Sequence, residues 1–349
     1  MSSITITDLS VTFADGTVGL DHVNIDVHPE EFVVLVGPSG SGKTTLLRTV
    51  AGFIAPSGGS LTIAGEDMTH VPPEKRRMGM VFQQHAVWPH MSVAGNVAYP
   101  LKRAGMDRAS ISRRVERALT LVGLDGFGRR SPASLSGGQR QRVALARAVV
   151  ADPTVLLLDE ALSALDEPLR DSLRRELVAL TRREGLTTVH VTHDRAEAIA
   201  IADRIVVLDQ GRVQQISTPS ELIEAPASAA VASFIGDATL LPATIAGEHV
   251  ECSVLTTAWK RDQVREMATL HPGDAATIAV TPLTVTVVPP GTPRSIEAVI
   301  TSVLFEITSY SITAETSGGQ KFRAQVTGTT PHIGETIGLE IVEPLVYPA

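Results

Sequence analysis

A run of glycines and small polar residues separates an apolar, strand-like segment from a helix-like one. It reads Gly37-Pro38-Ser39-Gly40-Ser41-Gly42-Lys43-Thr44. Glycines let backbone N–H groups approach phosphate oxygens without obstruction, and the start of the following helix adds partial positive charge. Lys43 is placed to reach β- and γ-phosphates, and the Thr44 hydroxyl to ligate Mg²⁺. The pattern predicts a phosphate-binding loop. The alternative is an ordinary glycine-rich turn.

Two carboxylates end a second apolar run, Val155-Leu156-Leu157-Leu158-Asp159-Glu160. Asp159, at the strand end, is suited to hold Mg²⁺ through water. Side chains alternate along a strand, so Glu160 points elsewhere and can face an attacking water as general base. Such a base typically contributes about 10² to 10⁴ in rate. The alternative is a pair of solvated charges at a strand terminus.

A histidine lies at the end of a further strand-like run. His193 follows Thr188–Thr192, and open parallel sheets place their ligands at the carboxyl ends of strands. We therefore expect His193 to contact a γ-phosphate rather than to serve a structural role. Asp194 and Glu197 after it resemble a helix capping box. Gln83, after another strand-like run, is weak evidence by itself because a glutamine is usually polar surface.

A second glycine turn, Leu135-Ser136-Gly137-Gly138-Gln139, opens a helix that runs to Val150. The serine hydroxyl and the glycine amides form another anion-binding terminus. Read alone, the turn could be a helix cap, a position that favours serine. One fold cannot easily wrap both glycine turns around a single nucleotide. The pair therefore suggests that two copies of the chain close on ATP.

The composition limits the class of protein. A chain of 349 residues should form about two domains, and 43% hydrophobic with 19% charged residues is typical of a soluble globular protein. The net charge of −8 argues against nucleic-acid binding. The single cysteine, Cys252, allows no internal disulfide and suits the cytosol. The N-terminal residues do not resemble a signal peptide, and the apolar runs are too short to span a bilayer. We expect any membrane role to come through a partner.

Strands and helices alternate over the first two thirds of the chain, which predicts an α/β fold with a mainly parallel, covered sheet. The expected strands include 32–36, 187–191 and 204–208. The expected helices include 43–51, 107–122 and a leucine-patterned segment from Leu169 that ends at Gly185.

The character of the sequence changes after about Gly236. Proline, glycine and threonine become frequent, and the apolar residues alternate with period two. Residues 276–288 read as a strand, and residues 311–326 as a hairpin around Gly318-Gly319. We predict two domains, residues 1–236 and 237–349, of which the second is a small all-β domain, a barrel.

Taken together, the motifs resemble those of the ATP-binding subunits of ABC transporters, specifically the ATPases of binding-protein-dependent importers. The resemblance covers residues from about 4 to 236. It identifies Gln83 as the Q-loop glutamine, which also contacts the metal, and His193 as the switch histidine. It further identifies Leu135–Gln139 as the signature, Asp159 and Glu160 as the Walker B pair, and Ser163-Ala164-Leu165-Asp166 as the D-loop.

The resemblance also implies contacts with the nucleotide. It places Phe13 where an aromatic ring stacks on adenine, and it adds Thr45 and Asp166 to the nucleotide-binding residues. From spacing alone, Phe13 reads equally well as a strand core residue.

The family implies a fold and a mechanism. The fold is a P-loop NTPase (RecA-like) ABC cassette with a helical subdomain at about residues 85–150, followed by an OB-like regulatory domain. Two ATPase domains dimerise head to tail, and ATP with Mg²⁺ lies between the phosphate loop of one and Ser136, Gly138 and Gln139 of the other. Closure drives integral membrane permease subunits, and an extracytoplasmic solute-binding protein supplies the solute. The chain would then lie peripherally at the cytoplasmic face of the cell membrane.

Within this family the segment 83–99, with Trp88-Pro89-His90, resembles the surface that receives the coupling helix of the permease. The alternative is a packed loop of the helical subdomain.

Two positions depart from the family pattern. Ala161 follows the catalytic glutamate where the family usually has proline, which removes no chemical group. Thr281-Pro282-Leu283 stands where importers with this accessory domain often have Arg-Pro-Glu. A dimer-stabilising role for the C-terminal domain is therefore as well supported as a sensing role.

Other classes of protein fit less well. Soluble ABC proteins of translation or repair usually have two cassettes or long insertions, and exporters usually carry a fused membrane span. A P-loop GTPase would need an Asn-Lys-x-Asp sequence, which this chain lacks. We expect an importer ATPase. The overall length and the accessory domain favour ferric iron, polyamine or phosphonate as the solute, with a sugar importer as the alternative. The solute itself is chosen by other subunits.

Overall fold

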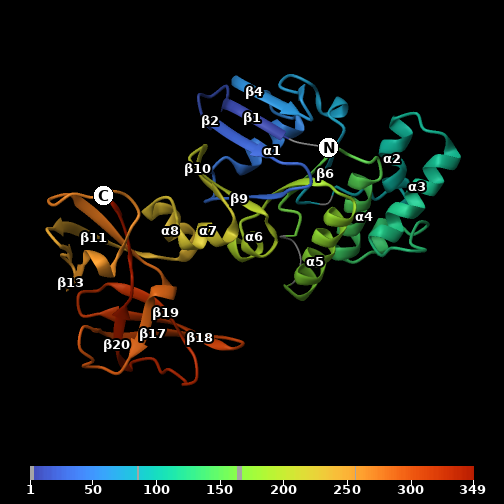
Figure 1. The fold of residues 1–349 in the computed structure, drawn as a ribbon. Helices are drawn as coiled ribbons and strands as arrows, with labels where there is room; N and C mark the ends of the chain where they lie inside the picture. Colours follow the sequence, from blue (N-terminus) through green and yellow to red (C-terminus); the bar gives the residue numbers. More distant parts are fainter. Residues whose placement is uncertain (1–3, 85, 163–166, 256) are drawn as a thin grey trace. The chain divides into compact units, whose positions relative to one another are not determined.

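The computed structural model describes residues 4–84, 86–162, 167–255 and 257–349 (Figure 1). The chain divides into two compact units between Pro219 and Ser220. This division lies N-terminal to the domain boundary expected at 236/237. Helix α8 (Ala229–Gly236) belongs to the second unit because its Ala232 is buried in a cluster with Ala279 and Tyr347 of the β sheets. A shorter helix, α7 (Pro219–Glu224), precedes it.

A six-stranded sheet forms the centre of the first unit, in the order β10-β9-β3-β8-β7-β6. All neighbouring pairs are parallel except β10 with β9. The parallel topology predicted from the alternation of strands and helices is confirmed. The strands are β3 (Phe32–Val36), β6 (Met78–Val81), β7 (Val155–Asp159), β8 (Thr187–Val191), β9 (Arg204–Asp209) and β10 (Arg212–Ser217).

The buried strands bring the predicted chemistry to one edge of this sheet. Every residue of β3, β7 and β8 is buried, as expected for strands covered on both faces. Because these three strands run in parallel, the phosphate loop, Glu160 and His193 all follow the same carboxyl edge.

A second, antiparallel sheet covers the first helix. It has the order β2-β1-β4-β5. Helix α1 (Lys43–Ala51) lies between the two sheets, since it contacts β2 of one and β7 and β8 of the other. Leu46 and Leu47 of α1 join both sheets in one hydrophobic cluster. The strands are β1 (Ile4–Thr12), β2 (Val18–Val27), β4 (Gly58–Ile63) and β5 (Glu66–Asp67).

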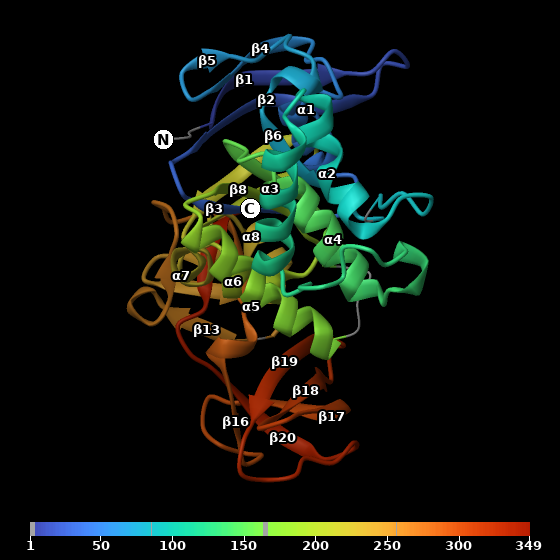
Figure 2. The same cartoon turned by 90° about the vertical axis from the view of Figure 1, so that its right-hand side faces the viewer.

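Three helices form a separate cluster beside the central sheet: α2 (Val93–Arg103), α3 (Arg108–Leu121) and α4 (Gly137–Val149). They bury Val97, Val115 and Val143 against one another, and α3 and α4 run side by side (Figure 2). The remaining helices are α5 (Glu167–Arg183) and α6 (Arg195–Ile201), with 3-10 turns at Pro73–Lys75 and Pro132–Ser134. Among the described residues, no helix has the length and apolarity needed to span a membrane.

After α8 the second unit consists of strands and short 3-10 turns, which confirms the all-β prediction for residues 237–349. Its strands form two sheets, β13-β12-β11-β15-β21-β14 and β16-β20-β17-β18-β19. Residues of both sheets, among them Trp259 and Phe322, share one hydrophobic cluster. The expected hairpin is present as β18 (Ser309–Thr316) and β19 (Lys321–Val326). The other strands are β11 (Thr239–Ala246), β12 (His249–Cys252), β13 (Thr257–Lys260), β14 (Arg265–Glu266), β15 (Ala275–Val280), β16 (Val285–Val288), β17 (Ile296–Glu306), β20 (Thr336–Ile341) and β21 (Leu345–Pro348).

The prediction of one strand over residues 276–288 is wrong. The segment divides into β15 and β16, which belong to different sheets, with a 3-10 turn at Pro282–Thr284 between them. Pro282 has no backbone N–H to donate and fixes its own φ, so the ladder cannot continue through it. The apolar alternation on both sides of the proline concealed the break.

Candidate nucleotide site

The phosphate loop is closed around the ammonium group of Lys43. The Nζ atom donates to the carbonyl oxygens of Gly37 and Pro38, each at 2.8 Å, and to Oγ of Ser41 at 3.1 Å. Burial lowers the pKa of Lys43, while the nearby carboxylate of Glu160 acts in the opposite sense. The lysine is thus desolvated, and its charge is available to a phosphate that enters the loop. The side chain of Thr44 follows in the first turn of α1 and is half-buried.

Two glycines of the loop are required by close backbone approach. A Cβ atom on Gly37 would lie 2.0 Å from the carbonyl oxygen of Leu208, and one on Gly42 would lie 2.6 Å from that of Gly19. Gly42 also has a φ of 101° as the cap of α1. The remaining loop residues Pro38, Ser39 and Gly40 are exposed, as expected for a loop that receives a ligand.

Asp159 is a buried carboxylate at the end of β7, with 5% exposure. Its nearest cation is the guanidinium of Arg48, whose Nη2 lies 3.9 Å from Oδ2. Burial raises the pKa of Asp159, although Arg48 opposes the shift. A carboxylate held at this cost suits a bound cation, and its oxygen chemistry fits Mg²⁺. Arg48 was not recognised from the sequence because it reads as an ordinary exposed residue of α1.

Three predicted residues from different segments meet at one carboxylate. Oε2 of Glu160 accepts a hydrogen bond from Nε2 of Gln83 at 2.7 Å, and it lies 3.7 Å from Nδ1 of His193. The backbone of Glu160 has a φ of 46°, and its N–H donates to the carbonyl of Val191 at the end of β8. This left-handed conformation follows directly on the end of the strand at Asp159.

The residue after Glu160 is held by a side chain of helix α4. Ala161 is buried, and its carbonyl accepts a hydrogen bond from Nε2 of Gln141, a buried residue of α4. The loop therefore has a specific anchor where the family usually has a proline. Sequence reasoning missed Gln141, because a glutamine inside a helix carries no signal of its partner.

Phe13 and Thr45 lie together beside the start of α1. A Cβ atom on Gly19 would stand 2.7 Å from the ring of Phe13 and 3.0 Å from the methyl group of Thr45. The ring is 40% exposed, so Phe13 is a surface aromatic and not a strand core residue. It lies near the phosphate loop, with a face open to solvent.

The signature residues belong to a different part of the unit. Ser136 caps α4, and its Oγ accepts from the N–H of Gln139 at 3.3 Å, while Oε1 of Gln139 accepts from the N–H of Ser136 at 3.0 Å. Gly138 is buried in the first turn. The adjoining Leu135 packs in the cluster of α2, α3 and α4, whereas α1 packs in the cluster of the two sheets. Within one chain the two glycine turns are therefore carried by separate hydrophobic clusters. The predicted D-loop, 163–166, lies outside the described residues.

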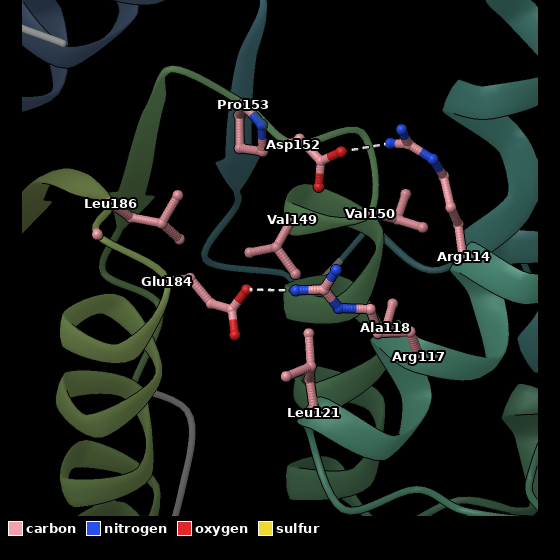
Figure 3. A pocket seen from close by; sticks show the side chains of 11 residues that line it. Arg114, Arg117, Ala118, Leu121, Val149, Val150, Asp152, Pro153, Glu184 and Leu186 are labelled. Carbon is pink, nitrogen blue, oxygen red and sulfur yellow. Dashed lines mark hydrogen bonds and ion pairs between the residues drawn. The ribbon is translucent and has the colours of Figure 1, made fainter. Parts of the chain in front are cut away.

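A pocket of about 260 Å³ lies where the C-terminal ends of α4 and α5 approach α3 (Figure 3). Arg114 pairs with Asp152 across it, and Arg117 pairs with Glu184 at 3.0 Å. None of the predicted nucleotide residues lines this pocket. Its cations are already paired with carboxylates, so it is a polar seam that ties α3 to the core.

A phosphate loop with a desolvated lysine, followed by a strand-end pair of carboxylates and a histidine just after the next strand, defines a P-loop nucleoside triphosphatase. Residues 20–163 match the sequence pattern of the family described as "ABC transporter". The spermidine/putrescine import ATP-binding protein PotA of Rubrobacter xylanophilus is 47% identical over 256 residues, 73% of this chain and 68% of that protein. PotA of Pseudomonas aeruginosa strain UCBPP-PA14 is 46% identical over 280 residues, 79% of this chain and 76% of that protein.

Another relative is named for a different solute, and a solved structure has a similar ATP-binding cassette. The sulfate/thiosulfate import ATP-binding protein CysA of Mycolicibacterium paratuberculosis is 49% identical over 247 residues, 71% of this chain and 68% of that protein. A dimeric ATP-binding cassette in a post-hydrolysis state, bound to ADP and Pi, superposes with a TM-score of 0.56 at 32% identity, covering 62% of this chain and 98% of that one. This chain belongs to the ABC transporter family, as an ATP-binding subunit that hydrolyses ATP to drive solute import. The predicted family and activity are confirmed.

Replacing Asp159 with asparagine should raise the melting temperature of the nucleotide-free, metal-free protein at pH 7 and strongly lower ATP hydrolysis. The pKa of Asp159 is raised above 3.8 by burial, so its ionised form weakens folding above the raised value, but not below 3.8, where folded and unfolded chains are both protonated. A gain of about 2–4 °C per kcal/mol is expected, and it should shrink as the pH falls toward 3.8. Thermal unfolding in EDTA measures the difference. A variant less stable than the parent at pH 7 would contradict the cost assigned to this carboxylate.

Proposed function

We propose that two copies of this chain bind two ATP molecules between them and power the uptake of a polyamine through membrane permease subunits. The observation that carries the catalytic part is the convergence of Gln83 and His193 on one oxygen of Glu160, beside the buried Asp159. In this arrangement Glu160 is the general base for the attacking water. His193 contacts the γ-phosphate, and Gln83 links the base to the metal.

The nucleotide is held by both glycine turns. Lys43 and the backbone N–H groups of residues 39–44 hold the phosphates, Phe13 stacks on adenine, and Thr45 completes the pocket beside α1. Thr44, Gln83 and Asp159 provide the oxygen ligands of Mg²⁺, which neutralises phosphate charge when bound. Ser136, Gly138, Gln139 and the D-loop Asp166 of the second copy would close the site.

The dimer is supported by the separation of the two turns. A helix N-terminus capped by serine and glycine amides is suited to an anion, yet α4 packs in a cluster of its own, apart from α1. A similar cassette is dimeric with ADP and Pi bound. We infer that the turn at Ser136 serves the phosphates of the neighbouring copy.

A hollow beside the Q-loop suits a helix of the permease. It has a volume of about 290 Å³ and apolar walls. The ring centres of Trp88 and Tyr99 lie 4.5 Å apart. The guanidinium carbon of Arg147 lies 4.6 Å from the ring centre of Trp88. The fully buried Asn96 binds both the N–H and the carbonyl of Trp88, which fixes this wall. The lining residues are Met78, Gly79, Met80, Phe82, Ala86, Trp88, Tyr99, Pro100, Arg147, Ala148 and Ala151.

A docked permease would place the chain peripherally at the cytoplasmic face of the membrane. An extracytoplasmic solute-binding protein would complete the importer, and the acidic chain would have no nucleic-acid partner. The names of the relatives favour a polyamine as the solute, with sulfate or thiosulfate as the second candidate, since a CysA protein is 49% identical to this chain. Of the three solutes predicted together, ferric iron, polyamine and phosphonate, the relatives named above support polyamine, and they give no support to the other two or to the sugar alternative.

Replacing Glu160 with glutamine should nearly abolish hydrolysis, by about 10²-fold or more, and leave ATP binding intact. The amide keeps the shape of the side chain but cannot accept the proton of the attacking water. The variant should therefore accumulate as an ATP-bound dimer, measurable by size-exclusion chromatography with nucleotide analysis. Hydrolysis at the parental rate would show that Glu160 is not the general base.

Mixed dimers test whether each nucleotide site is built from two chains. All chains carry Glu160→Gln, which prevents ATP turnover. Lys43→Ala and Ser136→Asp should each prevent nucleotide trapping in homodimers. Aspartate still caps the helix, but its charge repels the phosphate. A head-to-tail dimer of one copy of each variant concentrates both changes in one site and leaves the other intact. Such mixed dimers, isolated with two affinity tags, should retain one ATP per dimer. Trapping of two ATP molecules by the Ser136→Asp homodimer would contradict a site built from two chains.

The solute is tested with the complete importer in liposomes, assembled from this chain with its permease subunits and solute-binding protein. Labelled spermidine should enter in an ATP-dependent manner and stimulate hydrolysis, and the Glu160→Gln variant provides the inactive control. Uptake of sulfate but not spermidine would favour the second candidate.

A further inference from the structure

A buried acid and a buried histidine lie directly behind the loop that presents His193. His190, in β8, has no solvent exposure, and Glu197, in the first turn of α6, is 3% exposed. Nε2 of His190 lies 3.4 Å from Oε1 of Glu197. Neither residue has a part in the nucleotide site described above. Burying polar and ionisable side chains costs free energy relative to apolar ones, so packing alone does not account for these two residues.

The carboxylate of Glu197 holds the loop instead of capping the helix. The sequence pattern predicted a capping box, and half of it forms: Oδ1 of Asp194 accepts from the N–H of Glu197 at 3.0 Å. The other half is replaced, because Oε2 of Glu197 accepts from Oγ1 of Thr192 at 2.6 Å. Oγ1 of Thr192 in turn accepts from the N–H of Asp194 at 3.1 Å. Both residues that flank His193 are therefore connected to Glu197.

The charged surroundings keep this carboxylate ionised. Burial alone would raise the pKa of Glu197, but the imidazole of His190, the hydroxyl of Thr192 and the charge of Arg174 together hold it below the ordinary value. Hydrogen bonds to an ionised acceptor are shorter and stronger than those between neutral groups. His190 also lowers the pKa of Asp159, and its ring lies edge to face with that of Phe32 in β3. The bond from Thr192 is thus charge-assisted at neutral pH.

His193 depends on this anchor, because its own side chain is 65% exposed and has little packing to hold it. Its Nδ1 lies 3.7 Å from the carboxylate of Glu160, a distance set by where the loop backbone runs. We propose that Glu197 and His190 are positioning residues for ATP hydrolysis, which act through the hydroxyl of Thr192 to hold His193 against Glu160. This proposal rests on the function assigned to His193 and Glu160 above. A displacement of about 1 Å in such a contact can cost about 10²-fold in rate.

The test removes one hydroxyl. Thr192→Val keeps the shape of the side chain but breaks the connection to Glu197, and Thr192→Ser keeps the connection. We expect Thr192→Val to lower kcat by about 10- to 10²-fold with little change in the affinity for ATP, and Thr192→Ser to restore most of the rate. Thr188→Val is the matched control: Thr188 is buried in β8, the strand that leads to Thr192, and its hydroxyl donates to the carbonyl of Leu186. It should hydrolyse ATP near the parental rate.

A double-mutant cycle separates positioning from a general structural defect. In a His193→Ala background, Thr192→Val should cause little further loss of kcat, because the residue through which Thr192 acts is already absent. Equal losses in both backgrounds would overturn the proposal, even if Glu160→Gln behaves as expected, so the two hypotheses fail separately. Glu197→Gln, which removes the charge that strengthens the bond from Thr192, provides a second entry to the cycle if Thr192→Val folds poorly: its loss of kcat should likewise shrink in the His193→Ala background.

The contribution of the His190 imidazole is tested by the pH dependence of kcat. His190→Phe removes a group that lowers the pKa of Glu197, so the carboxylate should take up its proton at higher pH in the variant. The acid limb of the profile should move to higher pH relative to the parent, while Arg174 and Asp159, which also face the pair, are unchanged. An acid limb identical to that of the parent would exclude His190 from the network.

Discussion

The constraint on which the site depends is the left-handed turn of the backbone at Glu160. A non-glycine residue with a φ of 46° costs energy, and such strain persists only where surrounding contacts impose it. Here the N–H of Glu160 bonds to Val191 at the end of the adjacent strand, and the carbonyl of Ala161 is held by Gln141. The turn separates two consecutive carboxylates. Asp159 remains buried below the sheet edge, whereas Glu160 faces the glutamine and the histidine that converge on it.

The site also carries desolvated charge, which the fold tolerates for function. Burial opposes the charged forms of Lys43, Asp159 and Glu197, and in each case an oppositely charged or hydrogen-bonding group limits the cost. Lys43 donates hydrogen bonds to the phosphate loop, which a bound phosphate would replace. Glu197 accepts a hydrogen bond from Thr192 in the loop that it holds. Charges arranged in advance need little reorganisation when the reaction occurs. Stability and activity therefore make opposite demands on Lys43 and Asp159, whose pKa values burial shifts toward the neutral form.

Much of the fold and of the catalytic edge could be predicted from the sequence. Continuous apolar runs such as Phe32–Val36 mark covered strands, and motif residues follow them at fixed spacing, so topology brings the motifs together. Long-range side-chain partners carry no such local signal. The contact of Gln141 with Ala161, and the inward turn of Glu197 toward Thr192, depend on which segments the fold places side by side. The break at Pro282 was missed for a related reason, since alternation continues on both sides of it.

The separation of the two glycine turns follows from how the first unit divides its core. The phosphate loop is fixed by α1, which is wedged between two sheets, and the turn at Ser136 is fixed by α4, which packs with α2 and α3. Each turn is rigid within its own cluster, so neither can approach the other without moving a whole packed layer. The ion pair of Arg117 with Glu184 further ties α3 to the core. A second copy can supply the missing half of each site without such a rearrangement. In the proposed dimer, ATP binding would join two chains and hydrolysis would release them.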